Sequence, residues 1–224
     1  MIITIDGPAA SGKSSAAQAL AQKLGFYYIN TGFLYRAVTY CLSALHDYKR
    51  EDLKAVNKAD LAVCLDPQRL IYSYNSETGP RVAYDGQDIT SHLKDLEIDV
   101  RVALISPQPD VRHALCHFQR SVAQTKNIVV DGRDLGSVVF PYADYKFYLT
   151  ASLSVRAARW QKDQQKRGNI FTLQEAEECL NDRDMHDSSR LYSPAVMATD
   201  AITIDSSDLN FKEMLDQFLT RITL

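Results

Sequence analysis

The sequence predicts an α/β protein in which a doubly wound, five-stranded parallel sheet carries helices on both faces and a small antiparallel insertion interrupts the chain. In the outer thirds of the chain, short apolar runs alternate with segments of helical periodicity, which favours a parallel sheet. In the middle third, short strand-like runs are separated by turn residues, which favours antiparallel pairing. The length of 224 residues allows one substantial core without disulfide or metal support.

Five short apolar runs are expected to form the parallel strands, and they cover Ile2–Asp6, Phe26–Ile29, Ile128–Val130, Lys146–Leu149 and Ala201–Ile204. Apolar residues at helical spacing between residues 16 and 24 predict a helix after the first strand. The same spacing predicts a second helix from Phe33 to Leu45, with Asn30 or Thr31 as its N-cap. These elements make a strand, helix, strand, helix order at the start of the chain.

Residues 60–95 are interpreted as the antiparallel insertion, with strand-like runs at Leu61–Leu65, Leu70–Tyr74 and Arg81–Tyr84. Helical character resumes over Asp110–Thr125. Thr172 followed by Glu175 has the pattern of a capping box, which predicts another helix start. We therefore expect a single domain over residues 1–224, with a core of about 1–59 and 96–224 around the insertion.

Composition and charge exclude several classes of protein. With 25 Lys and Arg against 28 Asp and Glu, the net charge is −3, so we expect no nucleic-acid or membrane partner. The four cysteines lie far apart without a Cys-x-x-Cys pair, which favours reduced thiols and a cytoplasmic location. No stretch approaches the ~20 apolar residues that span a bilayer, and the opening run is too short for a signal peptide.

The strongest motif lies between the first strand and the first helix. It fits the pattern G-x-x-x-x-G-K-[ST] of a phosphate-binding loop (P-loop), which predicts a P-loop NTPase fold. Backbone N–H groups of such a loop converge on phosphate oxygens, Lys13 reaches the β- and γ-phosphates, and Ser14 is expected to ligate Mg²⁺ with ATP. The expected ATP-binding residues are Gly7, Pro8, Ala9, Ala10, Ser11, Gly12, Lys13, Ser14 and Ser15.

Two other patterns are interpreted as ordinary structure. Asn57-Lys58-Ala59-Asp60 matches a guanine-reading tetrapeptide, but it follows a charged stretch rather than an apolar strand, so a solvated helix surface is expected. His113, Cys116 and His117 have helical metal-ligand spacing without a further ligand cluster, so no metal site is expected there.

Arginines near loop and helix boundaries supply the local positive charge that the overall composition lacks. An acceptor that is itself a phosphate needs such charge, because two polyanions must be brought together and guanidinium groups bind phosphate in a bidentate way. The arginines considered are Arg36, Arg112, Arg133, Arg156, Arg159, Arg183 and Arg190.

These motifs together resemble those of bacterial-type cytidylate kinases, over nearly the whole chain. The blocks that carry the resemblance are Ile5–Pro8, Ser11–Ser14, Thr31-Gly32, Tyr35-Arg36, Val111-Arg112, Asp131–Gly136, Val138–Pro141, Arg183-Asp184, Asp187, Arg190, Ser193-Pro194 and Asp200-Ala201. The resemblance implies transfer of the γ-phosphoryl of ATP to CMP or dCMP, a CMP-binding insertion, a helical lid at about 154–190 and a monomer. Another P-loop small-molecule kinase, of UMP/CMP, dTMP or shikimate type, and a non-kinase P-loop ATPase stay open as alternatives.

The resemblance also implies roles for individual residues. Arg36, Arg133 and Arg190 would hold the CMP phosphate. Arg112 and Asp134 would read the cytosine, and Asp187 would hold the sugar hydroxyls. The implied catalytic set is Lys13, Arg133, Arg183, Arg156 and Arg159, and the implied CMP-binding set is Thr31, Arg36, Arg112, Gly132, Arg133, Asp134, Arg183, Asp187 and Arg190.

The metal that the resemblance implies is Mg²⁺ with ATP, near Ser14 and held through water by Asp131. Asn30 and Ala103 depart from the family pattern, since Asn30 stands where an aspartate is usual and Ala103 where a serine is frequent.

Overall fold

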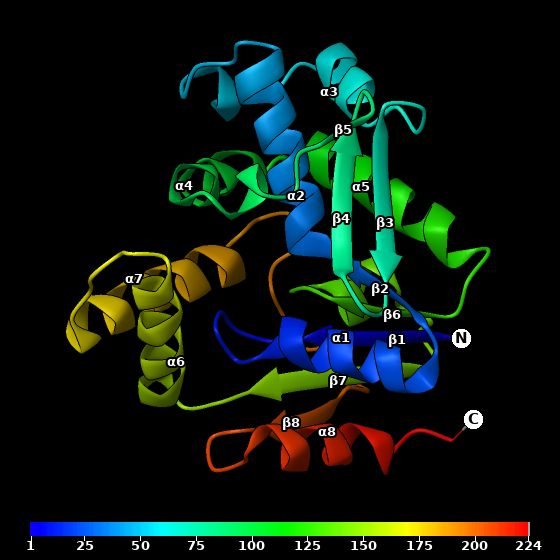
Figure 1. Ribbon diagram of the computed structural model, residues 1–224, viewed down its shortest axis with the longest axis vertical. Coiled ribbons are helices and arrows are strands. Elements are labelled where there is room, and N and C mark those ends of the chain that lie inside the picture. Colours follow the sequence, from blue (N-terminus) through cyan, green and yellow to red (C-terminus); the bar gives the residue numbers. More distant parts are fainter. Residues whose placement is uncertain (224) are drawn as a thin grey trace. The chain divides into compact units, whose positions relative to one another are not determined.

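The computed structural model describes residues 1–223, and it confirms the predicted α/β class with an additional antiparallel sheet (Figure 1). The strands of the main sheet are β1 (Ile2–Asp6), β2 (Tyr27–Asn30), β6 (Ile128–Asp131), β7 (Tyr145–Thr150) and β8 (Ile202–Asp205). Their order is β2-β6-β1-β7-β8, and β7 pairs in parallel with both β1 and β8. All five predicted strands are therefore present, with small differences at their ends.

The chain forms two compact units, one made of Met1–Leu24 and Val129–Leu224 and the other of Gly25–Ile128. We call them the P-loop unit and the central unit. The division into a core and an insertion at residues 60–95 stays a prediction. The last residue of that core, Leu224, lies outside the described residues.

The P-loop unit contains helices α1 (Lys13–Leu24), α6 (Leu153–Lys166), α7 (Leu173–Ser188) and α8 (Phe211–Leu219) and a π-helix at Leu135–Val139. The predicted capping box is present, because the Thr172 side chain accepts the Glu175 N–H and Glu175 accepts the Thr172 N–H. Helix α8 was not predicted. It begins with a capping box of its own at Asn210, and its Phe218 packs edge-on against Phe147 of β7. Helices α6 and α7 pack against each other.

The central unit contains α2 (Thr31–Tyr40), which continues into a π-helix at Cys41–Leu45, and the helices α3 (Lys58–Cys64), α4 (Leu96–Ile105) and α5 (Pro109–Ala123). Short 3₁₀-helices lie at Asp52–Lys54 and His92–Lys94. Its antiparallel sheet has the order β3-β4-β5, with β3 at Leu70–Asn75, β4 at Gly79–Tyr84 and β5 at Gln87–Asp88. β3 and β4 form the long cyan hairpin of Figure 1.

One predicted strand was wrong. Leu61–Leu65 is not a strand, because residues up to Cys64 belong to α3 and Leu65 follows as its C-cap. The Asn57 side chain caps this helix by accepting the Ala59 N–H, and Leu61 and Cys64 are its buried residues at helical spacing. The interpretation of Asn57–Asp60 as a helix surface is confirmed, since Lys58 and Ala59 are exposed on α3.

Among the described residues, no helix is long and apolar enough to cross a membrane.

Candidate active site

The phosphate loop connects the end of β1 to the first turn of α1, as its motif predicts. Gly7 has φ +145°, and a Cβ placed there would lie 2.0 Å from the Leu149 carbonyl oxygen of β7, so only glycine fits. Gly12 has φ +95° and Ala10 has φ +58°. A left-handed alanine is uncommon and persists only where the surrounding contacts hold it.

Three cationic side chains bind the carbonyl oxygens of this loop. Lys13 donates to the Pro8 carbonyl, Arg156 to the Ala9 carbonyl at 3.0 Å and Arg159 to the Ser11 carbonyl at 3.4 Å. In a planar trans peptide the N–H points opposite to the C=O. The N–H groups of Ala10 and Gly12 therefore point away from the two arginines.

The Lys13 side chain is buried, with 5% of its surface exposed, and charged groups of both signs lie near it. Burial lowers its pKa well below the usual value, and the positive charge of Arg133 lowers it further. Asp131 and Asp6 act in the opposite direction, while Arg183 adds to the lowering. Bound phosphate would supply the negative charge that this group lacks, so the site favours an anion beside Lys13.

Ser14 and Asp131 are brought together at the start of α1, where the Ser14 hydroxyl donates to Asp131 Oδ2 at 2.7 Å. Both offer hard oxygen atoms, which Mg²⁺ prefers, and Ser14 and Ser15 are exposed. Residues 1–223 contain no group of three or more His, Cys, Asp or Glu side chains that could hold a metal by themselves. The Ser14 hydroxyl and the Asp131 carboxylate together offer two oxygen ligands that suit Mg²⁺.

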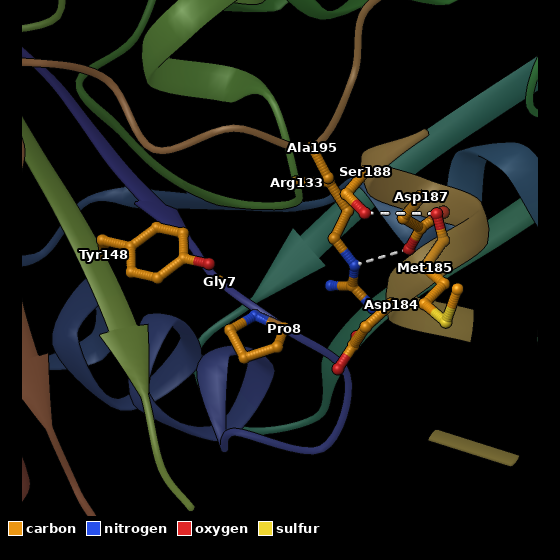
Figure 2. Close-up of a pocket in the computed structure, with 9 residues that line it drawn as sticks. All are labelled: Gly7, Pro8, Arg133, Tyr148, Asp184, Met185, Asp187, Ser188 and Ala195. Atoms are coloured by element: carbon orange, nitrogen blue, oxygen red, sulfur yellow. Dashed lines mark hydrogen bonds and ion pairs between the residues drawn. The ribbon is translucent and has the colours of Figure 1, made fainter. Parts of the chain in front are cut away.

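A cavity of about 230 Å³ lies beside the phosphate loop in the P-loop unit. Figure 2 shows the Tyr148 ring on one side of it and the side chains of Arg133, Asp184 and Asp187 on the other. The remaining lining residues are Gly7, Pro8, Met185, Ser188 and Ala195.

Asp187 is the centre of an ion-pair network at this cavity. Its Oδ2 accepts from Arg133 Nε at 3.0 Å, and its Oδ1 lies 3.4 Å from Arg190 NH1. Although burial acts to raise its pKa, the guanidinium groups of Arg133, Arg190 and Arg183 hold that pKa below the usual value. Asp187 is therefore ionised at neutral pH, and it pre-orients two arginines that the sequence assigned to an acceptor phosphate.

The other predicted residues of the P-loop unit lie on several of its elements. Arg183 is exposed on α7, and Arg156 and Arg159 lie on α6. Arg159 also donates to the Ser206 hydroxyl at 3.0 Å and to its carbonyl at 2.7 Å. Gly132 donates its N–H to the Ile5 carbonyl at 3.1 Å, and the buried Asp134 begins the π-helix at Leu135–Val139.

Three predicted residues, Thr31, Arg36 and Arg112, belong to the central unit. Thr31 is the buried first residue of α2, and Arg36 Nε donates to Asp99 Oδ1 at 2.6 Å. Arg112 is buried on α5, donates to the Ser106 carbonyl at 3.0 Å and lies over the Tyr35 ring.

The two departures from the family pattern also lie in the central unit. Asn30 uses both ends of its amide, since Oδ1 caps the Phe33 N–H at 3.0 Å and Nδ2 donates to the Tyr28 hydroxyl at 3.1 Å. Ala103 is exposed on α4.

Several residues of the site were not predicted from the sequence. Asp6 is buried and accepts the N–H groups of Leu135 at 3.0 Å and Gly136 at 2.7 Å, which holds the segment after Arg133 against the end of β1. Burial raises the pKa of Asp6 to about 6, although these hydrogen bonds act to lower it. Asp6 and Asp184 stood within recognised blocks but had no assigned role. Tyr148 gave no signal, because it lies within an apolar strand.

The cytidylate kinase family model matches residues 3–224, nearly the whole chain. The chain belongs to the cytidylate kinase family. Membership confirms the predicted enzyme class, an ATP-dependent nucleoside monophosphate kinase.

Two curated relatives agree in name. The cytidylate kinase of Caldanaerobacter subterraneus is 38% identical over 96% of this chain and 91% of its own. That of Desulfitobacterium hafniense is 36% identical over 97% of this chain and 90% of its own. A solved shikimate kinase of Bacteroides thetaiotaomicron aligns with 99% of this chain and 95% of its own at 12% identity, with a TM-score of 0.48 that is too low to bear on function.

Proposed function

We propose that this member of the cytidylate kinase family transfers the γ-phosphoryl of ATP to CMP or dCMP, giving ADP and CDP or dCDP. The observation that carries the proposal is the arrangement within the P-loop unit, where a phosphate loop with a buried Lys13 adjoins a cavity lined by Arg133 and Asp187. The phosphate loop can bind the phosphates of one nucleotide, and the arginines beside the cavity can bind the phosphate of a second one. A simple nucleotide hydrolase has no need of the second set of cations.

The phosphate loop would hold ATP in a fixed orientation. The N–H groups of Ala10 and Gly12 and the Lys13 ammonium would bind the β- and γ-phosphates, and negative phosphate would keep Lys13 protonated despite its lowered pKa. Ser14 and Asp131 would hold Mg²⁺ that arrives with ATP. Bound there, Mg²⁺ supplies charge neutralisation on the phosphate oxygens.

Arg133 and Arg190 would turn from Asp187 toward the phosphate of the acceptor. Each already lies within 3.4 Å of an Asp187 carboxylate oxygen, so the side chains are ordered before the acceptor enters. Once the phosphate takes over part of that charge, Asp187 gains capacity to accept a hydrogen bond from a sugar hydroxyl. The exposed Arg183 would add charge between the two phosphates.

We propose Asp134, in the P-loop unit, and Arg112, in the central unit, as the residues that recognise cytosine. A carboxylate accepts from the cytosine amino group, and a guanidinium donates to its O2 and N3 atoms. Uracil has a carbonyl in place of the amino group, so it would leave a buried Asp134 facing another acceptor. Thr31, Arg36 and Gly132 are proposed as further CMP contacts on the family resemblance.

The reaction needs no general base, because the attacking phosphate of CMP is already ionised near neutral pH. Positioning and charge neutralisation would then provide the rate. Exclusion of water is assigned to the lid proposed at residues 154–190, so that the phosphoryl group passes to CMP and not to water. A cytoplasmic monomer remains our expectation.

A panel of acceptors tests the proposal. Purified protein with ATP and Mg²⁺ is supplied in turn with CMP, dCMP, UMP, dTMP and shikimate, and ADP formation is measured. CMP or dCMP should be used most efficiently. Equal or better use of UMP or dTMP would reassign the acceptor, and ADP formation that does not depend on any acceptor would identify an ATPase.

A further inference from the structure

Asp184 on α7 contacts the phosphate loop directly. Its Oδ1 accepts the Ala9 N–H at 2.8 Å, and its Oδ2 accepts from Arg156 NH1. The same Arg156 nitrogen donates to the Ala9 carbonyl at 3.0 Å. Asp184 and Arg156 thus bind both backbone polar groups of one loop residue while they pair with each other.

Loss of one of these contacts would be destabilising, because the groups that make them are largely buried. Arg156 is 8% exposed, and its Nε also donates to the Ala151 carbonyl at 3.1 Å. Ala9 is buried in a small apolar cluster with Ala157 of α6 and Leu180 of α7. Loss of the Asp184 carboxylate would leave a buried guanidinium with its charge uncompensated.

The consequence for the phosphate loop follows from peptide geometry. The Ala9 carbonyl and the Ala10 N–H belong to one planar peptide and point in opposite directions. Because Arg156 holds that carbonyl, it also sets the direction of the Ala10 N–H. Ala10 has φ +58°, a strained conformation that relaxes when its neighbours are not held.

We propose that Asp184 is a positioning residue, which acts through Arg156 and Ala9 to hold the phosphate loop in its ATP-binding conformation. The inference rests on the proposed function only in naming ATP as the ligand of that loop.

The test compares full-length variants in three measurements: the Kd for ATP with Mg²⁺ in the absence of CMP, the KM for ATP and kcat with CMP, and the midpoint of thermal unfolding. Asp184→Asn keeps an acceptor for the Ala9 N–H but removes the charge that Arg156 needs. We expect the Kd and the KM for ATP to rise by about 10- to 100-fold, because a small misplacement of a binding group has effects of that size. Asp182→Asn, an exposed change on the same helix, is the matched control and should leave all three unchanged.

Three further variants separate positioning from simple loss of stability. Arg156→Lys keeps the charge but not the forked donor, and it should raise the KM for ATP in a protein that still unfolds cooperatively. Arg156→Gln alone and the double variant Asp184→Asn with Arg156→Gln complete a double-mutant cycle, and their losses of ATP affinity should be less than multiplicative because the two side chains hold Ala9 as one pair.

The proposal is overturned if Asp184→Asn or Arg156→Lys binds ATP within twofold of the unchanged protein, or if the two losses multiply in the double variant. A purely structural role would lower kcat with the folded fraction and leave the KM for ATP unchanged. The ATP titration uses no CMP, so its result stands whether or not CMP proves to be the acceptor.

Discussion

Gly7→Ala should be the most damaging single-methyl substitution in the phosphate loop. The added Cβ would lie 2.0 Å from the Leu149 carbonyl oxygen, and that oxygen belongs to the backbone of β7, so it cannot rotate away. The φ of +145° adds strain of about 1–3 kcal/mol for a residue with a side chain. Overpacking in a rigid region costs about 1–3 kcal/mol more.

We therefore expect Gly7→Ala to lose about 4 kcal/mol of unfolding free energy. In a chain of this size this lowers the midpoint of thermal unfolding by about 8–16 °C. Gly168→Ala is the matched control, because Gly168 also has a positive φ, +83°, but its Cβ would meet no atom within 4 Å. The control should lose only about 1 kcal/mol from the left-handed backbone. Calorimetric scans of both variants check this, and equal midpoints would refute the steric argument.

The remaining predictions concern single side chains of the P-loop unit. Lys13→Met should lower kcat by about 100- to 1,000-fold while the fold is retained. Steady-state kinetics measures the rate and a circular dichroism spectrum checks the fold; a near-normal rate would show that Lys13 does not act on the phosphates. Asp134→Asn should lower kcat/KM for CMP by about 10- to 100-fold with little change for UMP, whereas an equal loss with both would assign Asp134 to structure. The pKa of Asp6 is raised to about 6 in the folded protein, so between pH 4 and 6 the folded state binds more protons than the unfolded state. The contribution of Asp6 to the free energy of unfolding therefore falls as pH rises through this range, by about 3 kcal/mol in all. Urea unfolding across that range should therefore show a more positive slope of stability against pH in Asp6→Asn than in the unchanged protein, and identical slopes would contradict the burial argument.

The sheet and the phosphate loop could be predicted because their signals are local. β-Branched runs mark Ile2–Asp6 and Ile128–Asp131, and the glycine pattern lies between a strand and a helix. The Thr172 capping box is local for the same reason. The prediction of a strand at Leu61–Leu65 was wrong because a short apolar run is compatible with either a strand or a helix. The N-cap at Asn57 favours the helix.

The supporting residues of the site could not be predicted because their contacts are long-range. Asp184 binds Ala9 across 175 residues of sequence, and Asp6 binds Leu135 across 129. No periodicity or motif reports such pairs. The sequence did indicate that Arg156 and Arg159 belong with the nucleotide site, but not that both would bind carbonyl oxygens of the phosphate loop.

The fate of the γ-phosphoryl group distinguishes a cytidylate kinase from an ATP hydrolase. Purified protein is mixed with γ-labelled ATP, Mg²⁺ and excess CMP, and the products are separated. If CMP is the acceptor, the label appears in CDP, inorganic phosphate is a small fraction of the product, and little turnover occurs when CMP is omitted. Label released mainly as inorganic phosphate, at a rate that CMP does not change, would contradict that role of CMP.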